Sequence, residues 1–418
     1  MLQQRLRAAC PGRVSAVVDF CQRLIQTPSM PGAEGNIAAL VQREMTLLGY
    51  DGVEVDAAGN VIGFVRGGSG KTLMLNTHLD HVDVGNPDRW PLPPFSGAIH
   101  KDAIWGRGAM DIKGPLACQV HAPALLKAAG IEPAGDLYVT CTVMEEVGGI
   151  GAQLLAEQLR PDMAVVGEAS RCQVARGHRG RVEIEVCFTG RGAHASIPDQ
   201  AANPHYAVAR FLQAVEAMPM VENETFGPAT VAPTLYTSDQ ISRNVIPEQV
   251  TVVLDWRTVP EEGPERVLER VDALARETLA LLNETSLNVS MKSKKRVGNE
   301  AAFSVTSRIP TTNWKTYTGL EFVNPAIFPA FELGAEHALI QGARGALESV
   351  YDESVPIRTW RFATDGGHFM SAGIPTVGFG PGDDRLAHTT DEHISLDQME
   401  RGLLGNAALI AQLGRLGS

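Results

Sequence analysis

Helix-like and strand-like patterns of apolar residues alternate along the N-terminal part of the chain. In the expected helices apolar residues recur every three to four positions, and in the expected strands they form short continuous runs. The expected helices span residues 13–29, 35–48, 113–129 and 150–159, and the expected strands span residues 52–55, 60–65, 72–77, 137–144 and 163–167. This alternation predicts an α/β fold in which helices cover both faces of a mixed sheet.

The pattern changes near residue 175. Residues 181–190 (RVEIEVCFTG) alternate between apolar and polar positions, which is typical of a half-exposed antiparallel strand. The segments that follow predict a small α+β module in the order β-α-β-β-α-β. Its later elements are expected as a helix at 203–218, strands at 229–236 and 249–257, a helix at 263–282 and a strand in LNVSMK (287–292).

The apolar α/β pattern returns after this module. Residues 374–379 form another buried-strand run, whereas residues 294–330 are expected to be mostly loop. The predicted architecture is one domain formed by residues 1–174 and 294–418, with residues 175–293 inserted as a second domain. A length of 418 residues also favours two domains over a single core.

Composition and charge exclude several classes of protein. The chain is 44% apolar and 20% charged, as in soluble globular proteins, and no run approaches the ~20 apolar residues of a membrane span. The net charge of −12 argues against a nucleic-acid partner and against an anionic membrane surface. The six cysteines form no CxxC pair, which favours free thiols. Because the N-terminal segment lacks the apolar core of a signal peptide, we expect a cytoplasmic protein.

Acidic residues and histidines stand where the expected strands end. They follow the apolar runs in LMLNTHLD, LYVTCTVMEE and DMAVVGEAS, or they lie in the glycine-rich GRGAMDIKG and in LAHTTDE. The set consists of His78, Asp111, Glu145, Glu146, Glu168 and His388. Ligands of open α/β sheets bind outside the carboxyl ends of the strands, so these residues are predicted to share one site.

Each of these residues has a simpler structural interpretation when it is taken alone. His78-Leu79-Asp80 suits a polar strand end with a surface histidine, and Asp111 suits an ordinary turn. Glu145 and Glu146 suit the first turn of a helix, whose N-terminus attracts acids. Together, however, two imidazoles and three carboxylates suit a binuclear site for zinc, cobalt or manganese. The remaining glutamate is then a candidate general base.

The order and the flanks of these segments resemble the M20 family of metallopeptidases and deacylases over nearly the whole chain. That family includes deacylases of N-acyl amino acids, carboxypeptidases and dipeptidases. The resemblance is carried by THLDHVDVG (77–85), IWGRGAMDIKG (104–114), MEEVGG (144–149), GEAS (167–170), GRGAHASIPDQAANP (190–204), RNVIP (243–247), DWR (255–257), GIPTVGFGPG (373–382) and HTTDE (388–392).

The resemblance implies a binuclear centre with a specific set of ligands. One ion would bind His78 and Glu168, and the other would bind Glu146 and His388. Asp111 would bridge the two ions.

The resemblance also implies roles for two further residues of the site. Asp80 would orient the imidazole of His78. Glu145 would take a proton from water and later deliver it to the leaving amine. The peptide bond after Asp111 would be cis.

The inserted module would be the lid and dimerisation domain of a homodimer. His194 in GAHAS would reach the active site of the partner subunit and assist the tetrahedral intermediate. Asn244, Arg257 and Arg179 would hold the substrate carboxylate, for which arginine offers two parallel donors. Without the surrounding motifs, His194 suits a surface loop and the two arginines suit ordinary charged positions on strands.

Other classes of protein fit the sequence less well. Gly70-Lys71-Thr72 resembles the end of a phosphate-binding loop, but Val65 stands where the first glycine is required and a strand follows. The sequence contains no GxSxG motif, so it does not indicate a serine hydrolase. A non-catalytic relative would be expected to lack Glu145 or a metal ligand, yet all of them are present.

The sequence therefore predicts a homodimeric amide hydrolase with two divalent ions, zinc first and cobalt or manganese as alternatives. The predicted substrate is a small N-acyl amino acid or a short peptide with a free carboxylate. Dipeptidase or carboxypeptidase activity as the main role, and a non-catalytic metal-binding dimer, are the alternatives. Ala169 stands where the family usually has a proline, so the resemblance does not predict which acyl group the substrate carries.

Overall fold

The computed structural model describes residues 2–293 and 303–416 and divides the chain into two compact units. The first unit is formed by Met1–His178, Asn313–Asn324 and Phe331–Ser418, and the second by Arg179–Thr312 and Pro325–Ala330. The second unit is therefore an insertion in the first. It extends beyond residue 293, because β16 (Ser304–Arg308) and β19 (Ile327–Phe328) both pair with β9 (Arg181–Thr189).

The first unit is built on a mixed sheet, as the sequence predicts. Its central pairs are parallel, and antiparallel pairs lie towards both edges. In the described part of the chain the strands lie in the order β1 (Gly52–Val55), β2 (Val61–Val65), β6 (Leu137–Thr142), β3 (Leu73–His78), β7 (Met163–Val166), β22 (Thr376–Gly378), β8 (Val174–His178) and β20 (Phe331–Glu332), with β21 (Ile357–Trp360) also paired to β8.

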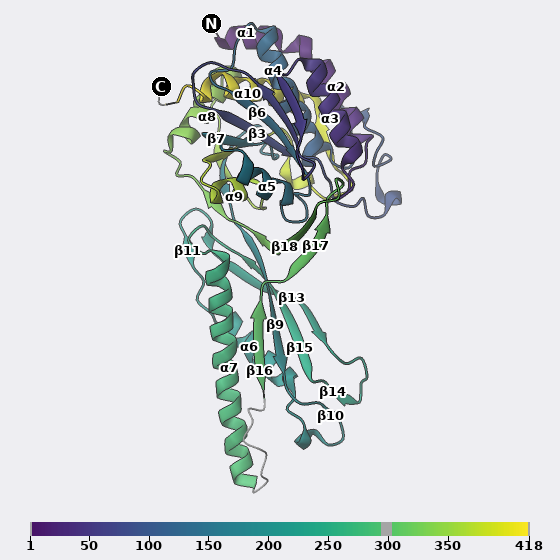
Figure 1. Cartoon of the computed structure of the whole chain (residues 1–418), viewed down its shortest axis with the longest axis vertical. Helices are drawn as coiled ribbons and strands as arrows, with labels where there is room; N and C mark the ends of the chain where they lie inside the picture. Colours follow the sequence, from purple (N-terminus) through teal and green to yellow (C-terminus); the bar gives the residue numbers. More distant parts are fainter. Residues whose placement is uncertain (1, 294–302, 417–418) are drawn as a thin grey trace. The chain divides into compact units, whose positions relative to one another are not determined.

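Helices cover both faces of this sheet. Alternate residues of β3 point to opposite faces, so Leu73 and Leu75 pack in one core and Met74 packs in another. The first face is covered by α1 (Leu2–Ala9), α2 (Pro11–Ile25), α3 (Gly35–Leu48), α4 (Gly114–Ala128), α8 (Ala338–Tyr351) and α10 (Leu396–Leu413). The opposite face is covered by α5 (Ile150–Gln158) and α9 (Gly366–Ser371), which Figure 1 shows across the sheet from α4 and α10.

Shorter strands complete the first unit. A small sheet is formed by β4 (Ala98–His100), β5 (Ala103–Trp105) and β23 (His393–Ser395). A hairpin is formed by β17 (Thr311–Lys315) and β18 (Glu321–Pro325). The pairing of β5 with β23 is important for the site, because it brings segments from opposite ends of the sequence together.

The second unit is a two-layer α+β module. Its antiparallel sheet has the order β13 (Thr230–Ser238), β15 (Gln249–Arg257), β9 and β16, and α6 (Pro204–Glu216) and α7 (Pro264–Ser293) pack against it. Alternate residues of β9 are buried, as expected from RVEIEVCFTG. Four short strands lie outside this sheet: β10 (Ala193–His194) pairs with β14 (Val245–Ile246), and β11 (Glu222–Asn223) pairs with β12 (Gly227–Pro228).

Two expectations for this region are wrong. LNVSMK (287–292) is not a strand, because α7 continues to Ser293 and no glycine or proline between Pro264 and Ser293 interrupts the helix. The last strand of the β-α-β-β-α-β order is instead β16. Residues 303–330 are not mostly loop, since they contain β16, β17, β18 and β19. Residues 294–302 of that segment lie outside the described residues.

The helices and the cysteines bear on membrane insertion and on disulfide bonds. Within residues 2–293 and 303–416, no helix combines the length and the apolar character required to cross a bilayer. All six cysteines are free in the structure, and five of them are buried.

The packing of the sheet generates the first prediction. A Cβ atom added to Gly378 of β22 would lie 1.9 Å from the indole of Trp360, whose ring is buried. Gly378→Ala should therefore lower the free energy of unfolding by ~1–3 kcal/mol or more, as measured by urea denaturation. In the control, Gly345→Ala on an exposed part of α8 meets no atom within 4 Å and should raise it by ~0.5–1 kcal/mol. Equal effects of the two substitutions would contradict this packing.

Candidate metal centre

Three neighbouring strands deliver side chains to one edge of the first unit's sheet. The strands β6, β3 and β7 are adjacent and parallel, so their carboxyl ends lie at the same edge. His78 is the last residue of β3, while Glu145 and Glu146 follow β6, and Glu168 follows β7. The convergence expected from the sequence is therefore present for these strands.

Two loops bring the remaining candidate ligands to the same edge. Asp111 lies in η2 (Ala109–Lys113), a short turn whose dihedral angles at this residue are not helical. The peptide bond between Asp111 and Ile112 is cis, as the resemblance implies. His388 follows the short helix η4 (Asp384–Leu386) and has a φ of 60°, in the left-handed region.

The carboxylate of Asp111 lies between two imidazoles. Its Oδ1 is 3.2 Å from Nε2 of His78, and its Oδ2 is 3.2 Å from Nε2 of His388. Nε2 of His78 is also 3.5 Å from Oε1 of Glu168, and Nε2 of His388 is 3.2 Å from Oε2 of Glu146. Each oxygen of Asp111 therefore faces a different imidazole–carboxylate pair.

These atoms form two candidate cation sites that share one residue. His78, Asp111 and Glu168 offer one set of ligand atoms, and Asp111, Glu146 and His388 offer the other. Within each set the ligand atoms lie within 4.8 Å of one another. In addition, Oε1 of Glu146 is buried without a hydrogen-bond partner. Nitrogen and carboxylate donors in this arrangement fit zinc and related divalent ions.

Asp80 contacts both His78 and the turn that carries the two glutamates. Nδ1 of His78 is 3.0 Å from the main-chain carbonyl of Asp80 and 3.5 Å from its carboxylate. A hydrogen on Nδ1 would leave Nε2 of the neutral ring available as a metal ligand. The carboxylate of Asp80 also accepts hydrogen bonds from the backbone N–H groups of Glu145 and Glu146, at 3.0 and 3.1 Å. Asp80 thus fixes more of the site than the orientation of one ring.

Two residues that the sequence did not single out hold the start of the same turn. The side-chain oxygen of Asn60 accepts a hydrogen bond from the N–H of Val143 at 3.0 Å, and Oε1 of Glu34 accepts one from Met144 at 3.2 Å. Met144 has a φ of 57°, which costs a residue with a side chain of the order of 1 kcal/mol or more. Glu34 precedes a helix, so the sequence suggested only an ordinary acid at a helix N-terminus.

The buried acids of the site repel one another and are separated from water. Burial raises the pKa of Glu145 well above its ordinary value, and the charges of Asp365, Glu168 and Glu146 raise it further. Burial also opposes ionisation of Asp111, but hydrogen bonds from His388 and His78 hold its pKa below the ordinary value. Hydrogen bonds to Asp111 and Glu146 raise the pKa of His388 to about 10. Without added cations, protons on the imidazoles are the charges that balance this cluster.

The other predicted site residues lie in the second unit. His194 is exposed on β10 and pairs with Val245, and the main-chain carbonyl of Asn244 accepts a hydrogen bond from the N–H of Ala195. Arg257 donates to Asp255 at 2.7 Å, and Arg179 donates to the carbonyl of Phe226. The roles of His194, Asn244, Arg257 and Arg179 towards substrate stay predictions.

The fold and the donor set define an α/β protein with a candidate binuclear metal centre. The chain belongs to peptidase family M20/M25/M40, whose family model matches residues 74–412. A relative in Escherichia coli (strain K12), the uncharacterized protein YgeY, is 29% identical over 381 residues, which covers 89% of this chain and 88% of the relative.

Solved structures show the same fold at lower sequence identity. The aminopeptidase PepT from Bacillus cereus has a TM-score of 0.73 at 18% identity, covering 95% of this chain and 98% of that chain. The Bacillus subtilis YXEP protein, described as a dinuclear metal binding peptidase from the M20 family, has a TM-score of 0.69 at 14% identity, covering 96% of this chain and 99% of that chain.

The position of Glu34 generates a prediction about pH. Burial, and then the charge of Asp80, raise the pKa of Glu34 to about 7. A raised carboxyl pKa gives stability that is complete below the unfolded pKa of ~4.3 and is lost as the pH rises towards 7. Glu34→Gln keeps an acceptor for the N–H of Met144, so at pH 8 it should raise the free energy of unfolding of the metal-free protein by roughly 1–3 kcal/mol.

The comparison is made by urea denaturation at pH 4.5 and pH 8. At pH 4.5 Glu34→Gln should match the wild-type chain, whereas the control Glu34→Ala, which removes the acceptor, should be less stable than Glu34→Gln at both pH values. A Glu34→Gln variant that is less stable than wild type at pH 8 would show that the ionised carboxylate is required.

Proposed function

We propose that this chain is a two-metal amide hydrolase that removes an acyl group from a small N-acyl amino acid or cleaves a short peptide. The observation that carries the proposal is the position of Asp111, whose two oxygens each face one imidazole–carboxylate pair. A shared carboxylate is the arrangement that holds two ions close together. When bound there, a pair of divalent ions would polarise the scissile carbonyl and lower the pKa of a water molecule.

The residues of the chain divide the remaining work between binding and proton transfer. His78 and Glu168 would hold one ion, Glu146 and His388 the other, with Asp111 shared between them. Zinc fits this set of nitrogen and oxygen donors, and cobalt or manganese are alternatives.

Glu145 is proposed as the general base and then the general acid. It is buried beside the clusters but belongs to neither ligand set. Its raised pKa suits a group that must take a proton from water and then release it to the leaving amine. The backbone bonds from its turn to Asp80 fix where this carboxyl group stands.

The substrate is proposed to carry a free carboxylate next to the scissile amide. Arg257, Arg179 and Asn244 would bind that carboxylate, and His194 of a second subunit would stabilise the oxyanion of the tetrahedral intermediate. PepT is described as an aminopeptidase, and this supports short peptides as candidate substrates beside N-acyl amino acids. Dipeptidase or carboxypeptidase activity is the alternative main role.

The proposed partner is a second copy of the chain, bound through the edge of the second unit's sheet. In the part of the chain that the structure describes, β13 pairs with β15 on one side and with no strand on the other. Leu235 and Tyr236 of β13 are about half exposed, and Tyr206 on α6 is 68% exposed. A long apolar edge strand attracts a second strand, so such edges are usually covered.

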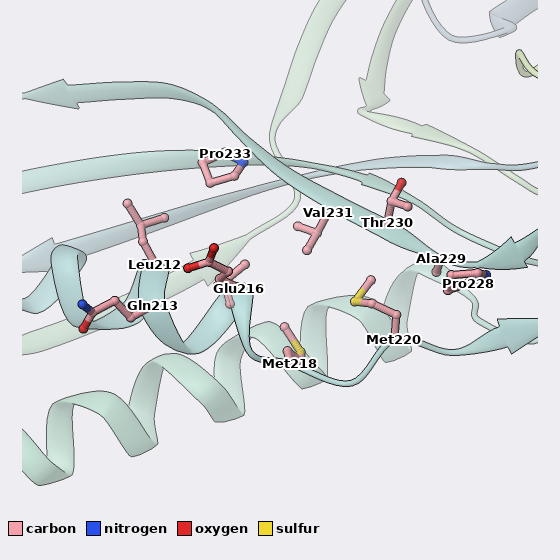
Figure 2. Close-up of a pocket in the computed structure, with 11 residues that line it drawn as sticks. Leu212, Gln213, Glu216, Met218, Met220, Pro228, Ala229, Thr230, Val231 and Pro233 are labelled. Atoms are coloured by element: carbon pink, nitrogen blue, oxygen red, sulfur yellow. The ribbon is translucent and has the colours of Figure 1, made fainter.

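A groove beside this edge is a second reason to propose another copy of the chain as the partner. It has a volume of about 660 Å³ and lies between α6 and β13. Figure 2 shows Val231 and Pro233 of the strand on one side of it and Met218 and Met220 on another. A partner strand and helix at the edge would cover these apolar side chains.

The role of Glu145 has a direct test with purified protein. Glu145→Gln should bind two zinc ions, as wild type does, but should hydrolyse N-acyl amino acids and dipeptides at least ~10²-fold more slowly, because the proton carrier is lost. Metal content is measured by elemental analysis and turnover by release of the free amine. Turnover near the wild-type rate would refute the general-base assignment.

Removal of metal tests the requirement for cations. Dialysis against a chelator should abolish turnover of the wild-type enzyme, and addition of zinc or cobalt should restore it. Magnesium serves as a control, since it prefers oxygen ligands and retains its waters. Full activity in the metal-free protein would contradict the proposed function.

The dimer edge can be disrupted by a charge. Leu235→Lys should convert a dimer with twice the 44.8 kDa mass of the chain into a monomer, as measured by sedimentation. The control Leu47→Lys changes a residue on α3 that is 82% exposed and should leave the dimer intact. A wild-type monomer would refute the proposed dimer, and an unchanged dimer of Leu235→Lys would place the interface elsewhere.

A further inference from the structure

A buried ion pair connects the two loops that carry Asp111 and His388. Glu392 is completely buried, and Arg107 is 3% exposed. Oε2 of Glu392 lies 2.6 Å from Nη1 of Arg107. The backbone places the two residues together because β5 and β23 pair directly beside them, with Trp105 opposite His393. Neither Glu392 nor Arg107 belongs to a candidate ligand set.

One side of this pair fixes the backbone of the shared ligand. Oε1 of Glu392 accepts hydrogen bonds from the N–H groups of Met110 and Asp111, both at 3.1 Å. Hydrogen bonds from two successive N–H groups to one carboxylate oxygen determine where that stretch of backbone lies. The position of the Asp111 carboxylate between His78 and His388 therefore depends on Glu392.

The other side of the pair reaches the loop of His388. Nη1 of Arg107 also donates to the carbonyl of Thr389, at 3.3 Å, next in sequence to His388. The guanidinium lies 4.8 Å from the ring centre of Trp90, so it is stacked as well as paired. The main-chain carbonyl of Glu392 accepts a further bond from Gly106 at 3.2 Å. Both loops are thus held by the same two side chains.

The two candidate cation sites depend unequally on this connection. His78 belongs to β3, which is paired on both sides within the sheet, and its side chain is 1% exposed. The side chain of His388 is 53% exposed, on a loop residue with positive φ. If the loops separate, His388 has no strand to hold its distance from Asp111, whereas His78 keeps its own place.

We propose that Glu392 and Arg107 are positioning residues that hold Asp111 and His388 at the spacing required by the cation site of Asp111, Glu146 and His388. This inference rests on the two-metal function proposed above. Loss of the pair weakens the ion at that site more than the ion at the site of His78 and Glu168. Partners that orient metal ligands typically change metal affinity by about 10–100-fold when they are removed.

The test is a zinc titration of the metal-free full-length protein, followed by calorimetry and by elemental analysis after gel filtration. Wild type should bind two ions per chain. Glu392→Gln should bind the second ion at least about tenfold more weakly and the first ion less weakened than the second, since both ions would share Asp111. Arg107→Lys keeps a positive charge opposite Glu392 but loses the planar guanidinium. It should weaken the affinity for the second ion as well, but to a smaller extent than Glu392→Gln.

A matched control separates positioning from general loss of stability. Glu44 is also a buried glutamate paired with an arginine, at 2.9 Å from Arg23, and it also contacts His121 at 3.1 Å. Glu44→Gln should lower the melting temperature of the metal-free protein without changing either zinc affinity. A change in the second affinity with Glu44→Gln equal to that with Glu392→Gln would overturn the proposal.

The remaining outcomes separate the positioning role of Glu392 and Arg107 from the two-metal function. Two unchanged affinities in Glu392→Gln, or in Arg107→Lys if Glu392→Gln does not fold, would refute the positioning role while leaving the two-metal function intact. A wild-type chain that binds no zinc would refute the two-metal function itself, and the positioning role would fall with it.

Discussion

The carboxylate of Asp111 is the interaction on which the rest of the site depends. It is partly buried and lies between imidazoles on opposite sides, so it joins the end of a central strand to a loop near the other end of the chain. Three more acids stand nearby, and this much negative charge is unfavourable in a site with little water. Protons on the imidazoles can offset part of it, and two divalent cations would offset more. The same repulsion that destabilises the empty cluster is therefore what would give it affinity for metal.

A second constraint is that most of the candidate ligands lie on turns or loops and must still be held in place. The turn after β6 is held by hydrogen bonds from its backbone to side chains. The four successive N–H groups from Val143 to Glu146 each donate to a side chain of Asn60, Glu34 or Asp80. The turn at Asp111 is held in the same way by Glu392. Acidic side chains that bind backbone rather than metal thus form a layer behind the ligands. This layer explains how Met144 can hold a backbone conformation in the left-handed region next to a proposed catalytic group.

Much of the fold, and the convergence of the candidate ligands on one edge of the sheet, could be predicted from the sequence, because both leave local signals. Apolar runs bounded by His78, Glu145 and Glu168 mark strand ends, and the helix at 35–48 is ended by Gly49 in the left-handed conformation. The supporting residues left no such signal. Glu34 and Asn60 lie far from the turn in sequence, and their roles depend on contacts that only the folded chain creates. The strand expected at 287–292 failed for a related reason, since short apolar alternation does not distinguish a strand from the continuation of a helix.

A shared metal centre at Asp111 is tested most directly by a crystal structure of the zinc-loaded protein with anomalous scattering measured at the zinc edge. We expect two peaks about 3.5–4 Å apart, one on each side of the Asp111 carboxylate. One peak would lie against His78 and Glu168 and the other against Glu146 and His388. A single peak, or two peaks that do not share Asp111, would contradict the central claim.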